Sequence, residues 1–177
     1  MTSLALASFK RFARQEDGTS TIEFLLIFPI IFTTFIATFE AGFFTMRYVM
    51  LDRGLDMTVR EMRLGLIAAP AMARIKQSIC AKGQLIGNCE AALNIELTSV
   101  NTTTWAFPTG RIECRDFGQA PNPVVEPNLG VENEVMLIRA CLVGRPMFPT
   151  AVMAANMARS SVGDYFVTAT SAFVNEP

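Results

Sequence analysis

The longest apolar stretch of the chain begins shortly after its N-terminus. Residues 24–39 carry no charged side chain, and the apolar run extends from Ile22 to Met46 apart from Glu23 and Glu40. At about 1.5 Å per residue, a helix of this length would measure about 37 Å, which is enough to cross a bilayer. The pattern predicts a transmembrane helix with Glu40 near its far interface, where the carboxylate stays hydrated.

A helical pattern continues beyond this run, because apolar residues recur every three or four positions while charged residues occupy the other faces. The apolar positions are Tyr48, Leu51, Leu55, Val59, Met62 and Leu66. This spacing predicts that the helix continues as an amphipathic segment whose apolar stripe packs against a domain core. Gly65 and Pro70 are expected to mark its end.

The rest of the chain shows one short helix and several strand patterns. A helix is expected over residues 71–81, followed by a loop that reaches Cys89, and the proline-containing segment 118–130 is also expected to be a loop. The segments that favour strands are 93–100, 111–114, 134–143 and 165–174, and the third is the most continuously apolar, as suits a central strand. Trp105 is expected to be a packing residue.

These elements predict an α+β fold: one long N-terminal transmembrane helix continuing into a small extracytoplasmic domain with an antiparallel sheet. The composition agrees with a membrane anchor, since the chain is 51% hydrophobic and its mean hydropathy is +0.34. With a formal net charge of −1 there is no broad basic field for a nucleic-acid backbone. The chain has no histidine, which weakens every enzyme hypothesis, and we assign no catalytic, cofactor-binding or metal-binding residue.

All four cysteines follow the apolar run: Cys80, Cys89, Cys114 and Cys141. An even number on one side of a membrane favours disulfides in an oxidising compartment, whereas a four-cysteine zinc site usually shows close Cys-x2-Cys pairs. The expected elements fit a Cys80–Cys89 pair and a Cys114–Cys141 pair. The sequence alone leaves three connectivities open.

A removable signal peptide is an alternative explanation of the apolar run, because basic residues precede it. It fits poorly, since the run is long, Glu23 opens it, and Phe39 and Glu40 stand where a cleavage site before Ala41 would need small residues. The positive-inside rule gives little help with orientation, because arginines also follow the run. The basic residues before and after it are Lys10, Arg11, Arg14, Arg47, Arg53, Arg60 and Arg63.

Orientation follows from the junction that precedes the run, Glu16-Asp17-Gly18-Thr19-Ser20-Thr21-Ile22-Glu23-Phe24. This segment resembles a type IV prepilin processing site, in which a short basic leader ends in Gly and the mature chain carries Glu at its fifth position. The resemblance implies cleavage after Gly18, with Thr19 as the new N-terminus. In pilins the amine of one subunit is thought to meet this glutamate of a neighbour, so Thr19 and Glu23 would form a docking pair. An internal contact between them, four residues apart on a helix, is the alternative.

A narrower resemblance rests on residues 18–29 with Glu23, Phe24 and Pro29, on residues 39–42, on the later Arg60 and Gly65, and on the C-terminal residues 173–177. These features are similar to the TadE-like proteins of the Flp, or tight-adherence, pilus system. The major Flp pilins are far shorter, so the large domain favours a minor pilin or pseudopilin. Pro29 is expected to kink the helix.

The expected organisation is a cytoplasmic leader (1–18), a transmembrane helix (19–46), its amphipathic continuation (47–66) and a periplasmic domain with disulfides (67–177). The resemblance implies a single-pass protein of the bacterial inner membrane with a cytoplasmic N-terminus, which joins a pilus or primes its assembly. Its expected partners are other pilins, a prepilin peptidase, the inner-membrane assembly platform and the lipid bilayer, and no cofactor or nucleic acid is expected. The competing hypotheses are an uncleaved bitopic scaffold protein of the cell envelope and a membrane-tethered enzyme.

Overall fold

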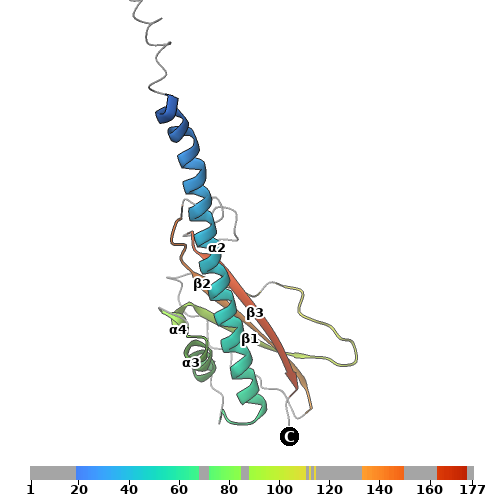
Figure 1. Cartoon of the computed structure of the whole chain (residues 1–177). Coiled ribbons are helices and arrows are strands. Elements are labelled where there is room, and N and C mark those ends of the chain that lie inside the picture. Colours follow the sequence, from blue (N-terminus) through green and yellow to red (C-terminus); the bar gives the residue numbers. More distant parts are fainter. Residues whose placement is uncertain are drawn as a thin grey trace, which may run out of the picture. The chain divides into compact units, whose positions relative to one another are not determined.

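The computed structural model describes residues 19–67, 72–84, 88–110, 112, 114, 133–149 and 163–174. The chain divides into two compact units, Met1–Phe39 and Glu40–Pro177. Figure 1 shows the elements, and their labels are kept below. The long helix α2 (Thr19–Arg63) contributes to both units, which are described separately.

Within the first unit, α2 is the apolar helix that the sequence predicts. An 18-residue window of this helix has a mean hydropathy of 2.1, and no residue of the window is buried. The helix is therefore long and apolar enough to cross a membrane. Pro29 lies inside α2, and the helix is assigned without interruption through it. The kink expected at Pro29 stays a prediction.

The second unit contains a three-stranded antiparallel sheet in the order β1-β2-β3 (Figure 1). Its strands are β1 (Leu93–Val100), β2 (Val135–Gly144) and β3 (Tyr165–Val174). The predicted α+β fold with an antiparallel sheet is confirmed. The apolar run of β2 has the central position that the sequence indicates, because this strand pairs with a neighbour on each side.

One strand prediction was wrong. The segment 111–114 was expected to be a strand, but Ile112 and Cys114, its described residues, lie outside the strands. The loop expected between Lys82 and Cys89 is confirmed at its described residues Gly83, Gln84 and Asn88, which lie between α3 (Met72–Lys82) and the short helix α4 (Cys89–Ala92). Apolar alternation over four residues is too short to separate a strand from an irregular segment held by a disulfide.

The core of the second unit lies between one face of the sheet and the helices. Leu51, Leu55 and Val59 of α2 are buried there, as the predicted stripe requires. The two ends of that stripe do not join the core, since Tyr48 is 44% exposed and Leu66 is 68% exposed. The other buried members come from α3, α4 and alternate strand positions: Ile75, Ile79, Cys89, Ala92, Leu93, Ile95, Met136, Ile138, Ala140, Leu142, Tyr165, Val167, Ala169 and Phe173.

The C-terminus of α2 is capped as the glycine there predicts. Gly65 has φ +66°, and its N–H donates to the carbonyl of Met62, while the N–H of Leu66 donates to the carbonyl of Glu61. These two bonds form a Schellman motif, which favours glycine because the residue adopts a left-handed conformation. The predicted end of the helix at Gly65 is therefore confirmed, while Pro70, which was also expected to mark it, lies outside the described residues.

The two disulfides join the pairs that fit the expected elements. Cys80 of α3 bonds Cys89 of α4, with their Cα atoms 5.9 Å apart. Cys114 bonds Cys141 of β2, with a Cα separation of 5.5 Å. The Cys114–Cys141 bridge holds Cys114 against the face of the sheet opposite the core. On this face, Arg139 of β2 also donates to the carbonyl of Gly110.

Candidate functional site

The predicted processing site stands at the start of α2. Gly18 lies outside the described residues, and the helix begins at Thr19. Glu23 is exposed on the helix, between Ile22 and Phe24, each 60% exposed. Among the described residues, none is found in an ion pair or hydrogen bond with Glu23. The site therefore presents a carboxylate on an otherwise apolar surface, which in lipid would need a proton or a cationic partner.

The surface around Glu23 is built for an apolar environment. Phe24, Phe28 and Phe32 are exposed and stack in succession, with ring centroids 5.1 and 5.5 Å apart. The hydroxyls of Thr33 and Thr34 donate to helix carbonyls four residues earlier, each at 2.8 Å. These bonds satisfy the threonine hydroxyls within the helix, so the polar side chains add little cost in lipid.

Glu40 occupies a different environment from the hydrated one that the sequence predicts. It is 1% exposed, and its carboxylate accepts the backbone N–H of Met147 at 3.2 and 3.1 Å and that of Phe148 at 3.1 Å. We call this set of contacts the Glu40 clamp. It joins the first turn of α2 in the second unit to the segment after β2. The prediction of a hydrated Glu40 was wrong, because the domain supplies backbone donors in place of water.

Next to the clamp, Arg47 connects α2 to the end of the sheet. Its guanidinium donates to the carbonyl of Arg145 at 2.8 Å and to the hydroxyl of Tyr165, which is itself 2% exposed. Burial raises the pKa of the Tyr165 phenol; Arg47 opposes this rise through its charge and its hydrogen bond, and Glu40 adds to it. Gly144 is required here, because an added Cβ would lie 2.7 Å from the Tyr165 ring. The cluster therefore fixes α2 to the strand ends.

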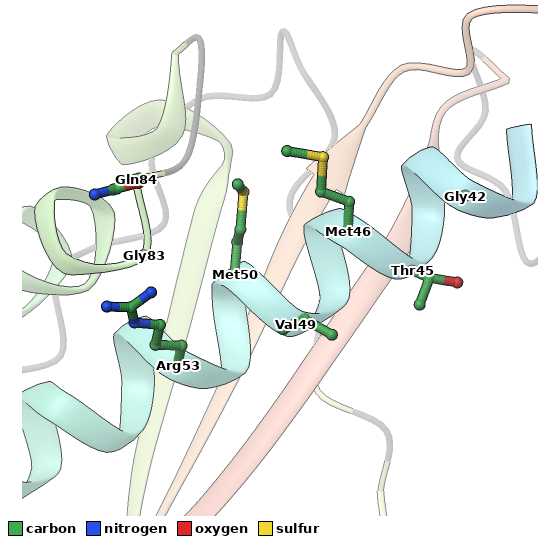
Figure 2. Close-up of a pocket in the computed structure, with 8 residues that line it drawn as sticks. All are labelled: Gly42, Thr45, Met46, Val49, Met50, Arg53, Gly83 and Gln84. Carbon is green, nitrogen blue, oxygen red and sulfur yellow. The ribbon is translucent and has the colours of Figure 1, made fainter. Parts of the chain in front are cut away.

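An open groove of about 560 Å³ lies between α2 and the turn after α3. Figure 2 shows the side chains of Met46, Met50 and Arg53 on the side of the helix that faces Gln84. The remaining lining residues are Gly42, Thr45, Val49 and Gly83. Flexible methionines beside one arginine suit an apolar side chain of another molecule better than a polar cofactor.

The described residues hold no group of three or more His, Cys, Asp or Glu that could bind a metal ion. Trp105, expected to pack, is 58% exposed and has φ 50° in a turn after β1. Its N–H donates to the carbonyl of Asn101, so the turn and not the core determines its position. The prediction that it is a packing residue was wrong.

The fold and the N-terminal helix together define a class of protein: a membrane-anchored chain with one apolar N-terminal helix and a small disulfide-bonded α+β domain. Residues 18–60 match the family model described as TadE-like protein. The resemblance predicted from the sequence is confirmed for this segment, which includes the proposed processing site, the apolar run and the Glu40 clamp residue. No curated protein and no solved structure matches the chain.

The structure confirms some of the predicted site residues, and it also contains a set of contacts that the sequence did not reveal. The cysteines are paired as expected, and Glu23 is exposed at the helix start. The Glu40 clamp was missed because its donors are backbone groups 107 and 108 residues away, which no local pattern encodes. A carboxylate at the boundary of an apolar run was the one available signal.

Proposed function

We propose that this chain is a membrane-anchored minor pilin or pseudopilin that takes part in the biogenesis of a Flp, or Tad, pilus. A prepilin peptidase removes residues 1–18 at the cytoplasmic face of the inner membrane, and the processed subunit assembles through its N-terminal helix. The domain from residue 67 onward lies in the periplasm, and the helix interacts with other pilins and with the inner-membrane assembly platform. The TadE-like match over residues 18–60 is the observation that carries this proposal.

The exposed surface of the helix around Glu23 supports an assembly role. Glu23 is a lone carboxylate among exposed aromatic and aliphatic side chains, and no described residue of its own chain pairs with it. After cleavage, the new amine of Thr19 on a neighbouring subunit is a cation that could neutralise Glu23 in lipid. A contact between subunits at this point would set the axial position of one helix against the next.

The groove beside α2 extends the surface on which a second helix could pack. Met46 is 47% exposed and Val49 is 55% exposed, and both line the groove. An apolar side chain of a neighbouring subunit would be buried there, at about 25 cal/mol for each Å² of apolar surface removed from water. The groove thus supports assembly along the helix in the second unit as well.

Processing is tested by the intact mass of protein extracted from membranes of a host that contains the peptidase. We expect a chain that starts at Thr19, and a Gly18→Leu variant that keeps its leader, because a bulky residue obstructs close approach by the peptidase. Wild-type protein that retains Met1 through Gly18 would instead favour an uncleaved scaffold of the envelope.

Docking is tested with a Glu23→Gln variant, which removes the charge and keeps the shape. We expect normal processing, membrane location and disulfides, together with loss of pili and reduced co-purification with other pilins. Glu61→Gln is a matched control, because it makes the same change on α2 at a half-buried ion pair with Lys82. A Glu23→Gln strain with normal pili and normal co-purification would contradict docking between subunits.

A further inference from the structure

The segment after β2 exposes two neighbouring large apolar side chains. It reads Arg145-Pro146-Met147-Phe148-Pro149, and Met147 is 52% exposed while Phe148 is 36% exposed. Single exposed apolar residues are common on soluble domains, but adjacent ones on an irregular segment need a specific reason. We call residues 145–149 the interface segment.

The Glu40 clamp fixes the position of the interface segment along α2. The backbone N–H groups of Met147 and Phe148 donate to the Glu40 carboxylate. The two apolar side chains therefore belong to the same residues whose backbone is held by Glu40. Glu40 follows directly on residues 24–39, which carry no charge. The interface segment therefore lies at the level along the helix where its charge-free run ends.

We propose that the interface segment is a second membrane-contacting element, in which the side chains of Met147 and Phe148 enter the headgroup region of the leaflet from which α2 emerges. This rests on α2 being the membrane anchor and does not depend on processing or pilus assembly. Two side chains provide far less area than the roughly 800 Å² per partner of a stable protein interface, which favours lipid over a protein partner. Apolar side chains on a polar backbone suit the bilayer interface.

The proposal revises the extent of the transmembrane segment. If the bilayer extended to Met46, the clamp would lie six residues, or about 9 Å, inside the hydrocarbon, together with the polar backbone of the interface segment. Irregular backbone exposed to lipid is not tolerated at that depth. A segment that ends at Phe39 places Glu40 and its donors in the headgroup region. Residues 19–39 form a helix of about 32 Å, which matches the hydrocarbon thickness of about 30 Å.

Depth-dependent fluorescence quenching tests the proposal on the full chain reconstituted into phosphatidylcholine vesicles with brominated acyl chains. Trp105 is the single tryptophan, and it follows the end of β1 that pairs with the start of β2. The interface segment follows the other end of β2, ten residues along. The wild-type chain is therefore the matched control, with its tryptophan about 30 Å away along the sheet.

In a Trp105→Phe background, we expect the Phe148→Trp variant to lose most of its fluorescence in brominated vesicles and to emit at shorter wavelength than the wild type. The wild type should lose little. A Met147→Trp variant in the same background is the second probe, in case Phe148→Trp does not fold, and complete protection of the thiols from alkylation reports correct folding. Flotation of the protein with the vesicles confirms the anchor independently.

Quenching of neither probe beyond that of Trp105, in protein that floats with the vesicles, would overturn the proposal while leaving the anchor and the pilin function intact. Short-wavelength emission without quenching would also overturn it, because it would place the interface segment against protein. Protein that fails to float would overturn both the anchor and the proposal.

Discussion

Replacing Glu40 with glutamine tests the strength of the clamp between α2 and the segment after β2. The substitution keeps the length and shape of the side chain, removes its charge, and converts one carboxylate oxygen into an NH2 group. Both oxygens accept N–H groups in the native structure, at 3.1 to 3.2 Å. Oε2 accepts both N–H groups and Oε1 shares that of Met147, so the variant can keep both contacts with a neutral oxygen, and its NH2 group takes the place of Oε1 beside the Met147 N–H.

The expected loss follows from the number and type of these contacts. A hydrogen bond to a charged group contributes about 1.5–3 kcal/mol and one between neutral groups about 0.5–1.5 kcal/mol, so each of the two bonds loses about 1–1.5 kcal/mol when the acceptor becomes neutral. Relief of the cost of burying a charge at a site that is 1% exposed offsets part of this loss. We expect the free energy of unfolding to fall by about 1.5–3 kcal/mol, which for a domain of this size lowers the melting temperature by about 6–12 °C.

The assay is thermal unfolding of the full chain in detergent micelles, followed by near-ultraviolet circular dichroism. Glu61→Gln is the matched control, because Glu61 lies on the same helix, is 38% exposed and pairs with Lys82. Glu61 is the more exposed partner of this half-buried pair, and an ion pair near the surface contributes about 0–1 kcal/mol, so this control should melt within about 4 °C of the wild type. If Glu40→Gln melted no earlier than Glu61→Gln, the carboxylate would not stabilise the contact, and our account of the clamp would be refuted.

Three further predictions follow from the second unit. Gly54→Ala should lower the free energy of unfolding by about 1–3 kcal/mol, because the added Cβ would lie 2.5 Å from a backbone oxygen of α3. Gly42→Ala is the control on the same helix, because the space around its Cβ is open. Equal melting temperatures of the two variants would contradict this prediction. In a Tyr48→Phe background, ultraviolet titration should place the pKa of Tyr165 above its ordinary value of about 10, and Arg47→Met should raise it further. Since the folded-state pKa is the higher one, the stability from the neutral phenol is complete below about pH 10 and is lost as the pH rises through the folded pKa. Alkylation under denaturing, non-reducing conditions should label none of the four cysteines, and labelled thiols would contradict the two disulfides.

The strands were largely predictable because their signal is local. The bounds of β1 and β3 agree with the alternating patterns at 93–100 and 165–174, and β2 is displaced by one residue from the predicted 134–143. A central strand is apolar on both faces, and Leu137 and Cys141 are indeed buried on the face opposite Met136 and Ile138. The continuous apolar run therefore carried topological as well as local information.

The cysteine pairing was only partly predictable. The sequence left three connectivities open, and the expected elements favoured the pairing that the structure contains. The bridge between Cys80 and Cys89 closes a short connection between two helices, which local spacing suggests. The partner of Cys141 depended on where Cys114 lies against the sheet, and the described residues Ile112 and Cys114 lie outside the strands. The pairing was thus right although one of its supporting elements was wrong.

Residues whose environment depends on distant backbone were not predictable. Trp105 is large and apolar, yet a turn with a left-handed backbone exposes it. A carboxylate that ends an apolar run has the same local pattern whether water or protein solvates it, so the sequence could not show that the domain itself buries Glu40. Only the return of the chain after β2 provides its donors. The sequence identified the carboxylate of Glu40 in the apolar run but not the backbone N–H groups that bind it.

The two carboxylates of the apolar run, Glu40 and Glu23, differ in their hydrogen bonding, because among the described residues the domain provides donors to Glu40 alone. Glu40 accepts two backbone donors from the second unit, so it needs no partner from another chain. Glu23 has no partner among the described residues, and it lies 17 residues earlier in the chain on α2. The folded domain thus satisfies one of the two carboxylates and leaves the other exposed on the helix. On the proposed function, extraction of the helix into a fibre would preserve the Glu40 clamp and expose Glu23 to a new neighbour, which gives the two residues separate roles in one helix.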